Sequence, residues 1–318
     1  GPAGDSLIAF LGSHTGVMAT FTPGATTAAL GDVMAGFSSR GGPAQTLGIN
    51  KPDVTAPGVQ ILAGASPQHV DVASGPNGEL FQAIAGTSMS SPHVAGAGAI
   101  IKAMHPDWTP GQIKSALMTT AKVNGIVKED EVTPATPYEY GGGRIDLSVA
   151  GNPGVTFDES AANFVTLKDQ LWNANYPSVY HPGLPGSLTV QRTAKNVTNR
   201  KTEWTITTST DKPDWKISVQ KELKIPAGGQ ASFNITIDAR SVPIGQVRHG
   251  FVWMKFGKIQ LHIPVSFVRS QAVVTINKSC APAIFAKKQS TTCTIRMQNT
   301  SFNPAIVTNT WKTEFTTT

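Results

Sequence analysis

The stretch GTSMSSPHVAGAGAIIKAMH, residues 86–105, decides the fold of the first half of this chain. Its apolar residues recur at spacings of three and four, which predicts a helix with one apolar face: Val94, Ala97, Ile101 and Met104. Pro92 suits the first turn of that helix, because an N–H there has no partner inside the helix. Ser88 is therefore expected just before the helix, where unpaired N–H groups and the helix dipole stabilise negative charge.

The hydroxyl of Ser88 has two interpretations at this position. Thr87 or Ser88 can serve as the N-cap of a buried helix, because serine and threonine are common caps. Alternatively, Ser88 is a nucleophile, since the same unpaired N–H groups would stabilise the oxyanion of an acyl-transfer reaction. In that case we expect Gly86 and Thr87 to shape the substrate site, because a glycine lets a substrate chain approach the backbone closely.

Two glycines interrupt the predicted helix, Gly96 and Gly98. Each costs about 1 kcal/mol relative to alanine in a helix interior. We therefore expect the helix to pack tightly against neighbouring backbone.

The rest of residues 1–150 combines strand, turn and helix patterns, which predicts an α/β fold. IAFLGS at 8–13 is a short apolar run that ends in turn residues, so it predicts a buried strand. KPDVTAPGVQILAGAS at 51–66 predicts two short strands separated by a turn at Pro57-Gly58. Thr109 to Gln112 reads Thr-Pro-Gly-Gln, a capping box that begins a second helix. One face of that helix carries Ile113, Ala116, Leu117 and Thr120.

From about Leu188 the sequence becomes all-β. Short runs, most of them alternating, are separated by turn residues at a spacing typical of a β-sandwich: LTVQRTAKNV, EWTITTST, WKISVQ, ASFNITIDA and FVWMKFGKIQLHIPVSFV. The chain is therefore divided into an α/β domain at 1–150, a linker and the first part of the next domain at 151–187, a sandwich at 188–269, and a truncated further β-sandwich module at 270–318.

Residues 86–121 resemble the nucleophile segment of the subtilisin-like serine proteases, the subtilases, through the motif G-T-S-M-x-x-P-H-V-A-G. FSSRG at 37–41 and KPDVTAPG at 51–58 are similar to subtilase segments that precede the serine. YGGGRIDLSVA at 140–150 and the β-rich half resemble the branch that has a protease-associated insert and a fibronectin type III-like domain. The resemblance implies a partial parallel-sheet catalytic domain that begins near the end of that insert, with Ser88 as nucleophile.

A serine nucleophile needs a base, and the base needs a third group to orient it. In subtilases the order Asp, His, Ser implies that both partners precede Ser88. The preceding histidines, His14 and His69, lack the family context, and so do the preceding acids: Asp5, Asp32, Asp53, Asp71 and Glu79. His93 lies five positions after Ser88 on the predicted helix and matches a family histidine that is not the base. We expect the base and its acid to come from an N-terminal part outside these residues, so this chain alone is expected to be inactive.

Charge and composition exclude several other functions. Residues 1–150 hold 7 Lys and Arg against 11 Asp and Glu, and residues 151–318 hold 19 against 9. The basic residues of the second half are scattered along predicted strands, which favours a solvated sheet face over a nucleic-acid site. No apolar run is long enough for a membrane span, no acidic cluster has the spacing of a calcium loop, and no cofactor motif occurs.

The second half also carries signs of the secretory pathway. Cys280 and Cys293 are separated by a span that one hairpin can close, which predicts a disulfide in an oxidising compartment; two free buried thiols are the alternative. N-x-S/T triplets occur at Asn196, Asn234, Asn277 and Asn299, and a eukaryotic secretory host can glycosylate such sites.

Two functions remain from the sequence. The first is a secreted serine endopeptidase fragment that hydrolyses protein or peptide substrates through Ser88. The second is a non-catalytic extracellular module, in which the β-domains bind surface partners and the protease remnant is a scaffold. An upstream Asp-Thr-Gly and His-Gly-Thr-His pair in the gene would favour the first.

Overall fold

The computed structural model describes most of the chain: residues 2–20, 28–43, 45, 47–68, 77–271, 274–281 and 291–299. The chain consists of two compact units, residues 1–31 and residues 32–318. Each unit is described by itself below.

The first unit contains the helix α1, Pro2–Ser13. Its last turn is closed by Ser13, whose Oγ lies 3.1 Å from the Ala9 carbonyl and 3.0 Å from the Phe10 carbonyl. The prediction of a strand at 8–13 is therefore wrong. The apolar run is too short to show a period of its own, and the residues before it extend it to a 12-residue helix.

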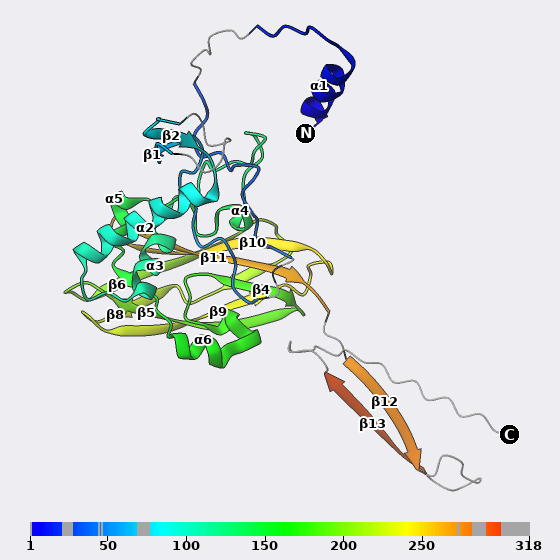
Figure 1. The fold of residues 1–318 in the computed structure, drawn as a ribbon. Helices are drawn as coiled ribbons and strands as arrows, with labels where there is room; N and C mark the ends of the chain where they lie inside the picture. The colour runs from blue at the N-terminus through cyan, green and yellow to red at the C-terminus, as the bar shows by residue number, and fades with distance from the viewer. Residues whose placement is uncertain are drawn as a thin grey trace, which may run out of the picture. The chain divides into compact units, whose positions relative to one another are not determined.

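In the second unit, a strand pair leads into two helices (Figure 1). The strands β1, Ile61–Gly64, and β2, Phe81–Ile84, pair antiparallel. The helices are α2, Thr87–Met104, and α3, Pro110–Thr119. The second strand predicted in 51–66 is thus present as β1. In place of the first, the structure has a single parallel bridge between Thr55 and Arg144.

The start of α3 confirms the predicted capping box. The Thr109 hydroxyl accepts a hydrogen bond from the Gln112 N–H, and the Gln112 side chain accepts one from the Thr109 N–H. Pro110 occupies the first position of the helix. The predicted inner face is buried at Ala116, Leu117 and Thr120, so α3 is the helix that anchors this segment.

The all-β half is a sandwich of two sheets. The first sheet has the order β4-β11-β10-β6-β8, with β4 parallel to β11 and the other neighbours antiparallel. The second has the antiparallel order β3-β5-β9-β7. The strand bounds are β3 Val155–Thr156, β4 Val179–Leu184, β5 Ser187–Asn196, β6 Thr202–Thr210, β7 Lys216–Ser218, β8 Glu222–Ile225, β9 Gln230–Asp238, β10 Val247–Phe256 and β11 Ile259–Arg269.

The predicted strands after Leu188 are confirmed, and each of those runs contains a strand of the sandwich. Three further strands of the sandwich were not predicted, namely β3, β4 and β8. β3 and β4 come from the stretch taken as linker and first part of the next domain, and their residues Val155, Val179 and Leu184 lie in the sandwich core.

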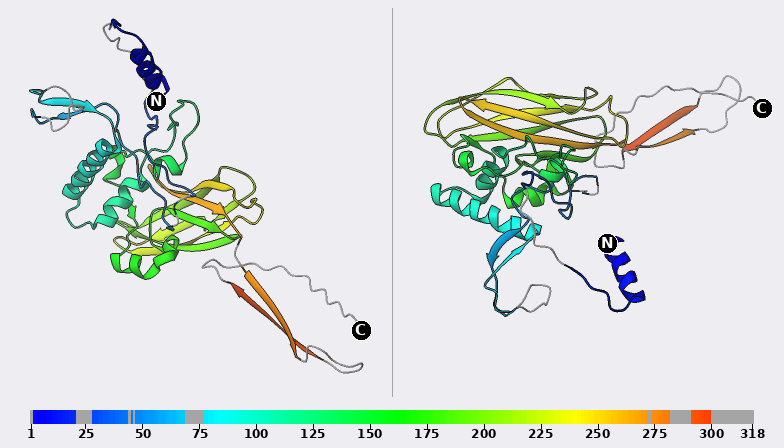
Figure 2. Two further views of the ribbon diagram at one scale, coloured as in Figure 1. Left: turned by 45° about the vertical axis from the view of Figure 1, so that its right-hand side comes forward. Right: turned by 90° about the horizontal axis from the view of Figure 1, so that it is seen from above.

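The sandwich and the segment that carries α2 and α3 share buried surfaces, with the helices on one side of the sandwich (Figure 2). Met118 of α3 packs in one cluster with Ala174 and Tyr176. Hydrogen bonds cross the same boundary: the N–H of Phe157 donates to Ser115 Oγ at 2.9 Å. The two parts therefore fold against each other as one body.

Short elements connect these parts. They are the helices α4 Pro137–Tyr140, α5 Leu147–Ala150 and α6 Ala161–Leu167, and the 3-10 helix η2 Lys168–Asn173. The α4 turn continues into a glycine-rich segment that lies against the rest of the chain so closely that a side chain at Gly141 would meet the Pro52 carbonyl.

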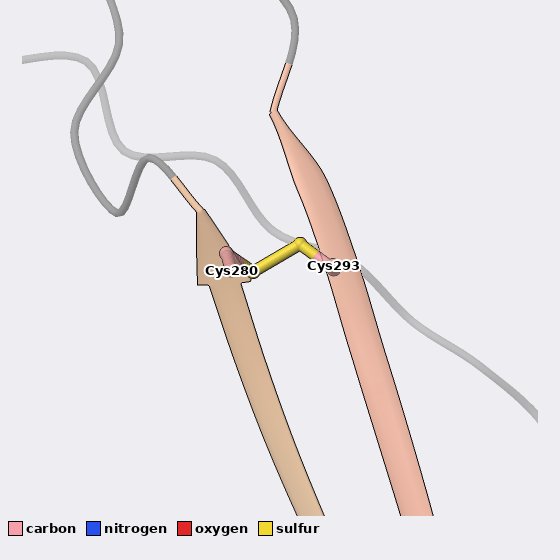
Figure 3. The surroundings of a disulfide bond; sticks show 2 residues. All are labelled: Cys280 and Cys293. Atoms are coloured by element: carbon pink, nitrogen blue, oxygen red, sulfur yellow. A yellow bond between two sulfur atoms is a disulfide. The ribbon is translucent and has the colours of Figure 1, made fainter.

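The last described part is a hairpin of β12, Val274–Ala281, and β13, Thr292–Asn299. Cys280 and Cys293 face each other in the register and are joined by a disulfide, with their Cα atoms 4.0 Å apart (Figure 3). Residues 300–318, the remainder of the predicted further module, lie outside the described residues.

Candidate active site

The helix α2 begins earlier than its sequence pattern predicts. Its N-cap is Gly86, whose backbone is extended (φ 166°, ψ 157°) and which has no side-chain capping bond. Ser88 is thus the second residue of the helix rather than the residue before it, and Pro92 lies in the second turn. Neither Thr87 nor Ser88 is the N-cap, so the capping interpretation of these hydroxyls is wrong. Pro92 is tolerated inside the helix with its ring on the exposed side.

The Ser88 side chain is exposed, and none of the described residues forms a hydrogen bond with its hydroxyl. In the described part of the chain, the N–H groups of Thr87 and Ser88 also have no backbone acceptor, whereas the Met89 N–H donates to the Gly86 carbonyl at 2.9 Å. An 18-residue helix adds partial positive charge at this end. A free hydroxyl thus lies beside two unpaired donors, an arrangement that can hold an oxyanion.

The segment 56–58 fixes the start of α2. The Gly86 N–H donates to the Gly58 carbonyl at 2.8 Å, and the Ser90 hydroxyl donates to the Ala56 carbonyl at 2.7 Å. The backbones approach so closely that a side chain at Gly58 would meet Ser90 Oγ and would lie 2.9 Å from the Gly86 oxygen. Sequence reasoning found the Pro57-Gly58 turn but missed this contact, because nothing local indicates which segment the turn lies against.

The two glycines of α2 do not have the predicted role. No atom lies within 4 Å of the place where a side chain at Gly96 would begin, and at Gly98 the nearest atom is a methyl carbon of Ile113 at 3.9 Å. Only Ala97 and Ile101 of the helix are buried, while Met104 is half exposed at 51%. The expected tight packing against backbone is therefore wrong for the residues that the structure describes.

Ser88 forms no hydrogen bond with any of the described histidines. His93 follows on the same helix, and its Nδ1 bonds the Met89 carbonyl at 2.8 Å. His14 belongs to the first unit, where its ring bonds the Phe10 carbonyl at 2.9 Å. His69 and Asp71 lie outside the described residues.

Two of the upstream acids, Asp32 and Asp53, pair with cations. Asp32 forms ion pairs with Lys122 at 2.8 Å and Arg144 at 2.5 Å. Burial by itself would raise the pKa of the Asp32 carboxyl, but these two cations outweigh it and hold the pKa below the usual value. Asp32 is therefore a structural ion-pair partner.

Asp53 is the centre of a second charged cluster. Lys51 lies 2.7 Å and Lys114 3.4 Å from its carboxylate, and the Tyr176 hydroxyl donates to it. Burial would raise the pKa of this carboxyl, but Lys51, Tyr176 and Lys114 together hold the pKa below its usual value. The cluster links KPDV, which precedes the serine segment, to the sandwich.

An apolar groove of about 440 Å³ lies between α2 and α3. Its lining includes the side chains of Val94, Ile113, Leu117 and Trp108, together with those of Lys102 and Lys114. None of its lining residues is Gly86, Thr87 or Ser88, so the groove is separate from the serine.

No group of three or more His, Cys, Asp or Glu side chains among the described residues is arranged to hold a metal ion. None of the helices in that part of the chain has the length and apolar character needed to cross a membrane.

Comparison with known families places both halves of the chain. Residues 9–143 match the model of the subtilase family, and residues 173–267 match that of a fibronectin type-III domain. The second match falls on the sandwich, and the first includes α2 with Ser88.

Relatives from Arabidopsis thaliana match across both halves. Subtilisin-like protease SBT5.3 is 32% identical over 81% of this chain and 37% of its own length. Subtilisin-like protease SBT1.6 is 30% identical over 86% of this chain and 41% of its own length. A CO(2)-response secreted protease is 31% identical over 81% of this chain and 39% of its own length. The chain thus spans less than half the length of these relatives.

Proposed function

Because the chain belongs to the subtilase family, with a subtilase segment followed by a fibronectin type-III domain, we propose that it is part of a secreted serine endopeptidase. Ser88 is the nucleophile in this proposal. It attacks the carbonyl carbon of a peptide bond and forms an acyl-enzyme, which water then hydrolyses. The observation that carries the proposal is the exposed Ser88 hydroxyl beside the unpaired N–H groups of Thr87 and Ser88.

The geometry supports separate roles for the groups around this serine. The tetrahedral intermediate places negative charge on the former carbonyl oxygen, and the first-turn N–H groups are donors for that charge. Gly86 and Thr87 form the edge of the site beside the extended entry from β2, so a substrate chain passes next to them. The segment 56–58 holds this edge through Gly58 and Ala56.

The base and the acid that orients it come from a part of the protein outside these 318 residues. The partners of two upstream acids support this part of the proposal, since Asp32 and Asp53 are paired with lysine and arginine. Without a base the serine hydroxyl is a weak nucleophile. The proposal therefore assigns to this chain the nucleophile and the oxyanion donors, and no turnover by itself.

Secretion is the second element of the proposal. The disulfide between Cys280 and Cys293 requires an oxidising compartment, and one of the similar proteins is named a secreted protease.

A fluorophosphonate probe tests the site, because it labels only serines that are activated as nucleophiles. This chain alone should not be labelled. The chain mixed with the upstream polypeptide of its own gene, or the complete protein, should be labelled at Ser88 and should cleave a chromogenic peptide.

The matched variants are Ser88→Ala and Ser91→Ala. Ser91 lies on the same exposed turn, and no described residue is its hydrogen-bond partner. Loss of labelling in Ser88→Ala together with unchanged labelling in Ser91→Ala supports the assignment. Equal labelling of the Ser88→Ala variant and the unchanged protein would refute it, and an upstream gene segment with neither Asp-Thr-Gly nor His-Gly-Thr-His would favour a non-catalytic module.

A further inference from the structure

The four N-x-S/T triplets of the second half differ sharply in their surroundings. Asn196 lies at the end of β5 and is fully buried. Its Nδ2 donates to the carbonyls of Arg200 at 2.8 Å, Pro226 at 2.9 Å and Ile225 at 3.2 Å. Its Oδ1 accepts from the Thr198 N–H at 2.9 Å and the Thr198 hydroxyl at 2.7 Å.

These five contacts use the whole amide of Asn196 to join two turns of the sandwich. A sugar on Nδ2 would remove one of the two N–H groups and would occupy space that is closed to solvent. Burial of a polar group without its hydrogen bonds is destabilising, and the steric conflict adds to that loss. Asn196 is therefore a structural residue, and its triplet includes Thr198 because the threonine is one of its hydrogen-bond partners.

Asn234 has the opposite environment. It is exposed at the middle of β9, and no described residue bonds to its amide. Gln191 of β5 lies directly opposite Asn234 in the sheet. On the other side of β9, Ser218 of β7 lies opposite Thr236, two residues after Asn234. Together these side chains line a polar hollow of about 420 Å³ on the outer face of the sheet.

The walls of this hollow carry no charged side chain: they are Gln191, Ser218, Val219, Gln220, Ser232, Phe233, Asn234 and Thr236. Amides and hydroxyls of this kind exchange hydrogen bonds with the hydroxyl and acetamido groups of a sugar without the desolvation of an ion. The threonine of the triplet, Thr236, bonds Thr189 on the neighbouring strand at 2.9 Å and leaves the Asn234 amide clear.

Asn277 is also exposed. It lies on β12 opposite Arg296 of β13, and no described residue bonds to its amide. The same hairpin holds the Cys280–Cys293 disulfide, so Asn277 passes through a compartment that oxidises thiols. The side chain of Asn299 lies outside the described residues.

We propose that Asn234 and Asn277 are N-glycosylation sites of this protein and that Asn196 is not. In the reaction, the side-chain amide nitrogen attacks the anomeric carbon of an oligosaccharide carried on a lipid pyrophosphate. The bond from that carbon to the pyrophosphate oxygen breaks, the lipid pyrophosphate leaves, and one amide proton passes to a base of the transferase. The finished fold must accommodate the modified side chain, which the exposed Asn234 and Asn277 allow and the buried, fully bonded Asn196 does not.

The test is secretion of this chain from a eukaryotic host, followed by peptide mapping after glycan removal in heavy-oxygen water, which marks each formerly occupied asparagine. Every version carries Ser301→Ala, so that the triplet of Asn299 does not contribute. Occupied Asn234 and Asn277 with unoccupied Asn196 in the soluble, folded fraction is the expected result. Occupancy of Asn196 in that fraction, or empty Asn234 and Asn277, would overturn the proposal.

Matched variants make the assignment independent of any single substitution. Thr236→Ala and Ser279→Ala should each remove one glycan from the secreted protein, and the double variant should be secreted without any. Thr198→Ser keeps both the triplet and the hydroxyl bond at Asn196 and should leave the pattern unchanged. Ser88→Ala should also leave it unchanged, which separates this result from the fate of the proposed protease activity.

Discussion

The hydroxyl of Tyr176, which belongs to the sandwich side of the chain, donates a hydrogen bond to the carboxylate of Asp53, which lies just ahead of the segment that fixes the serine helix. The Gly142 N–H donates to the Asp53 carbonyl at 2.8 Å, so the same residue is held through its backbone as well. From Asp53 the chain runs directly to Ala56 and Gly58, the residues that bind the start of α2. The sandwich is thus connected by hydrogen bonds to the surroundings of Ser88.

Tyr176→Phe should weaken this connection. We expect a loss of about 1.5–3 kcal/mol in the free energy of unfolding, because the acceptor is a charged carboxylate. The pKa of Asp53 should rise, since one of the groups that lower it is removed. Tyr140→Phe is the control, because Tyr140 is equally buried and its hydroxyl has no hydrogen-bond partner among the described residues. Equal losses for the two variants in urea unfolding would contradict this role of Tyr176.

Gly58→Ala should disturb the start of α2. The new methyl group would press on Ser90 Oγ and the Gly86 oxygen, and such overpacking costs about 1–3 kcal/mol. Hydrogen exchange at the Met89 N–H should become faster, and in the complete protein Ser88 should react more slowly with a fluorophosphonate. Gly64→Ala is the matched control, because nothing lies within 4 Å of a side chain there. The idea fails if the two variants behave alike.

Stability should fall on acidification between about pH 6.5 and pH 4. His262 is buried against the Gly142 carbonyl, with its Nε2 at 2.5 Å from that oxygen. Burial lowers the pKa of His262 from 6.5 to about 4, although the bond to Gly142 acts in the opposite direction. The unfolded chain therefore binds a proton in this window that the folded chain does not, and unfolding becomes easier as pH falls.

This histidine accounts for about 3 kcal/mol over the window, at 1.36 kcal/mol per pH unit. His262→Gln keeps a donor for Gly142 but does not titrate, so its unfolding free energy should depend less on pH between 6.5 and 4. Burial also lowers the pKa of His249 to about 4, so part of the slope should persist in the variant. Identical slopes for the variant and the unchanged protein would rule out this contribution of His262. Further loss below about pH 4 is expected from the carboxyls whose pKa is lowered in the fold, with Asp32 and Asp53 among them, because protonation removes the ion pairs that stabilise their charged forms.

Arg192→Met should be among the most damaging substitutions in the sandwich. Arg192 is fully buried and donates to four backbone carbonyls, those of Trp172, Tyr176, Ser178 and Gln191. Methionine fills a similar volume but leaves these acceptors without a donor, so we expect a loss of about 3–5 kcal/mol.

Arg240→Met is the comparison for this prediction. Arg240 is 67% exposed and pairs with Asp238 at the surface, so its loss should change the stability far less than the loss of Arg192. Chemical denaturation of both variants measures the difference. Similar midpoints would show that the buried guanidinium is not needed to satisfy these carbonyls.

The sequence predicted those helices and strands whose defining residues lie close together in the chain. Thr109 and Gln112 form the capping box because both partners lie within one turn, and β5, β6 and β9 alternate between buried and exposed residues as their sequences do. The strand β4 was missed because Pro182 and Gly183 interrupt its pattern, and β8 because it is only four residues long.

The start of α2 and the residues that fix it needed the structure. Pro92 indicates a helix start by rule, yet the helix begins five residues earlier, after Gly86, whose N–H donates to the Gly58 carbonyl. The bond between Tyr176 and Asp53 joins residues 123 positions apart, and no periodicity reports such a contact. The position of Ser88 in the sequence was thus predictable from a motif, whereas its surroundings depend on long-range contacts.

The joint between α3 and the sandwich bears on how this protein was assembled in evolution. Ser115 and Met118 of α3 contact Phe157 and Tyr176, which follow later in the chain. A break in the gene at the apparent border near residue 150 would therefore expose two complementary surfaces that are buried against each other in the intact chain. Exchange of the sandwich between proteases would have to carry the matching helix face along with it. A substitution on one side of the joint should therefore need a compensating change on the other.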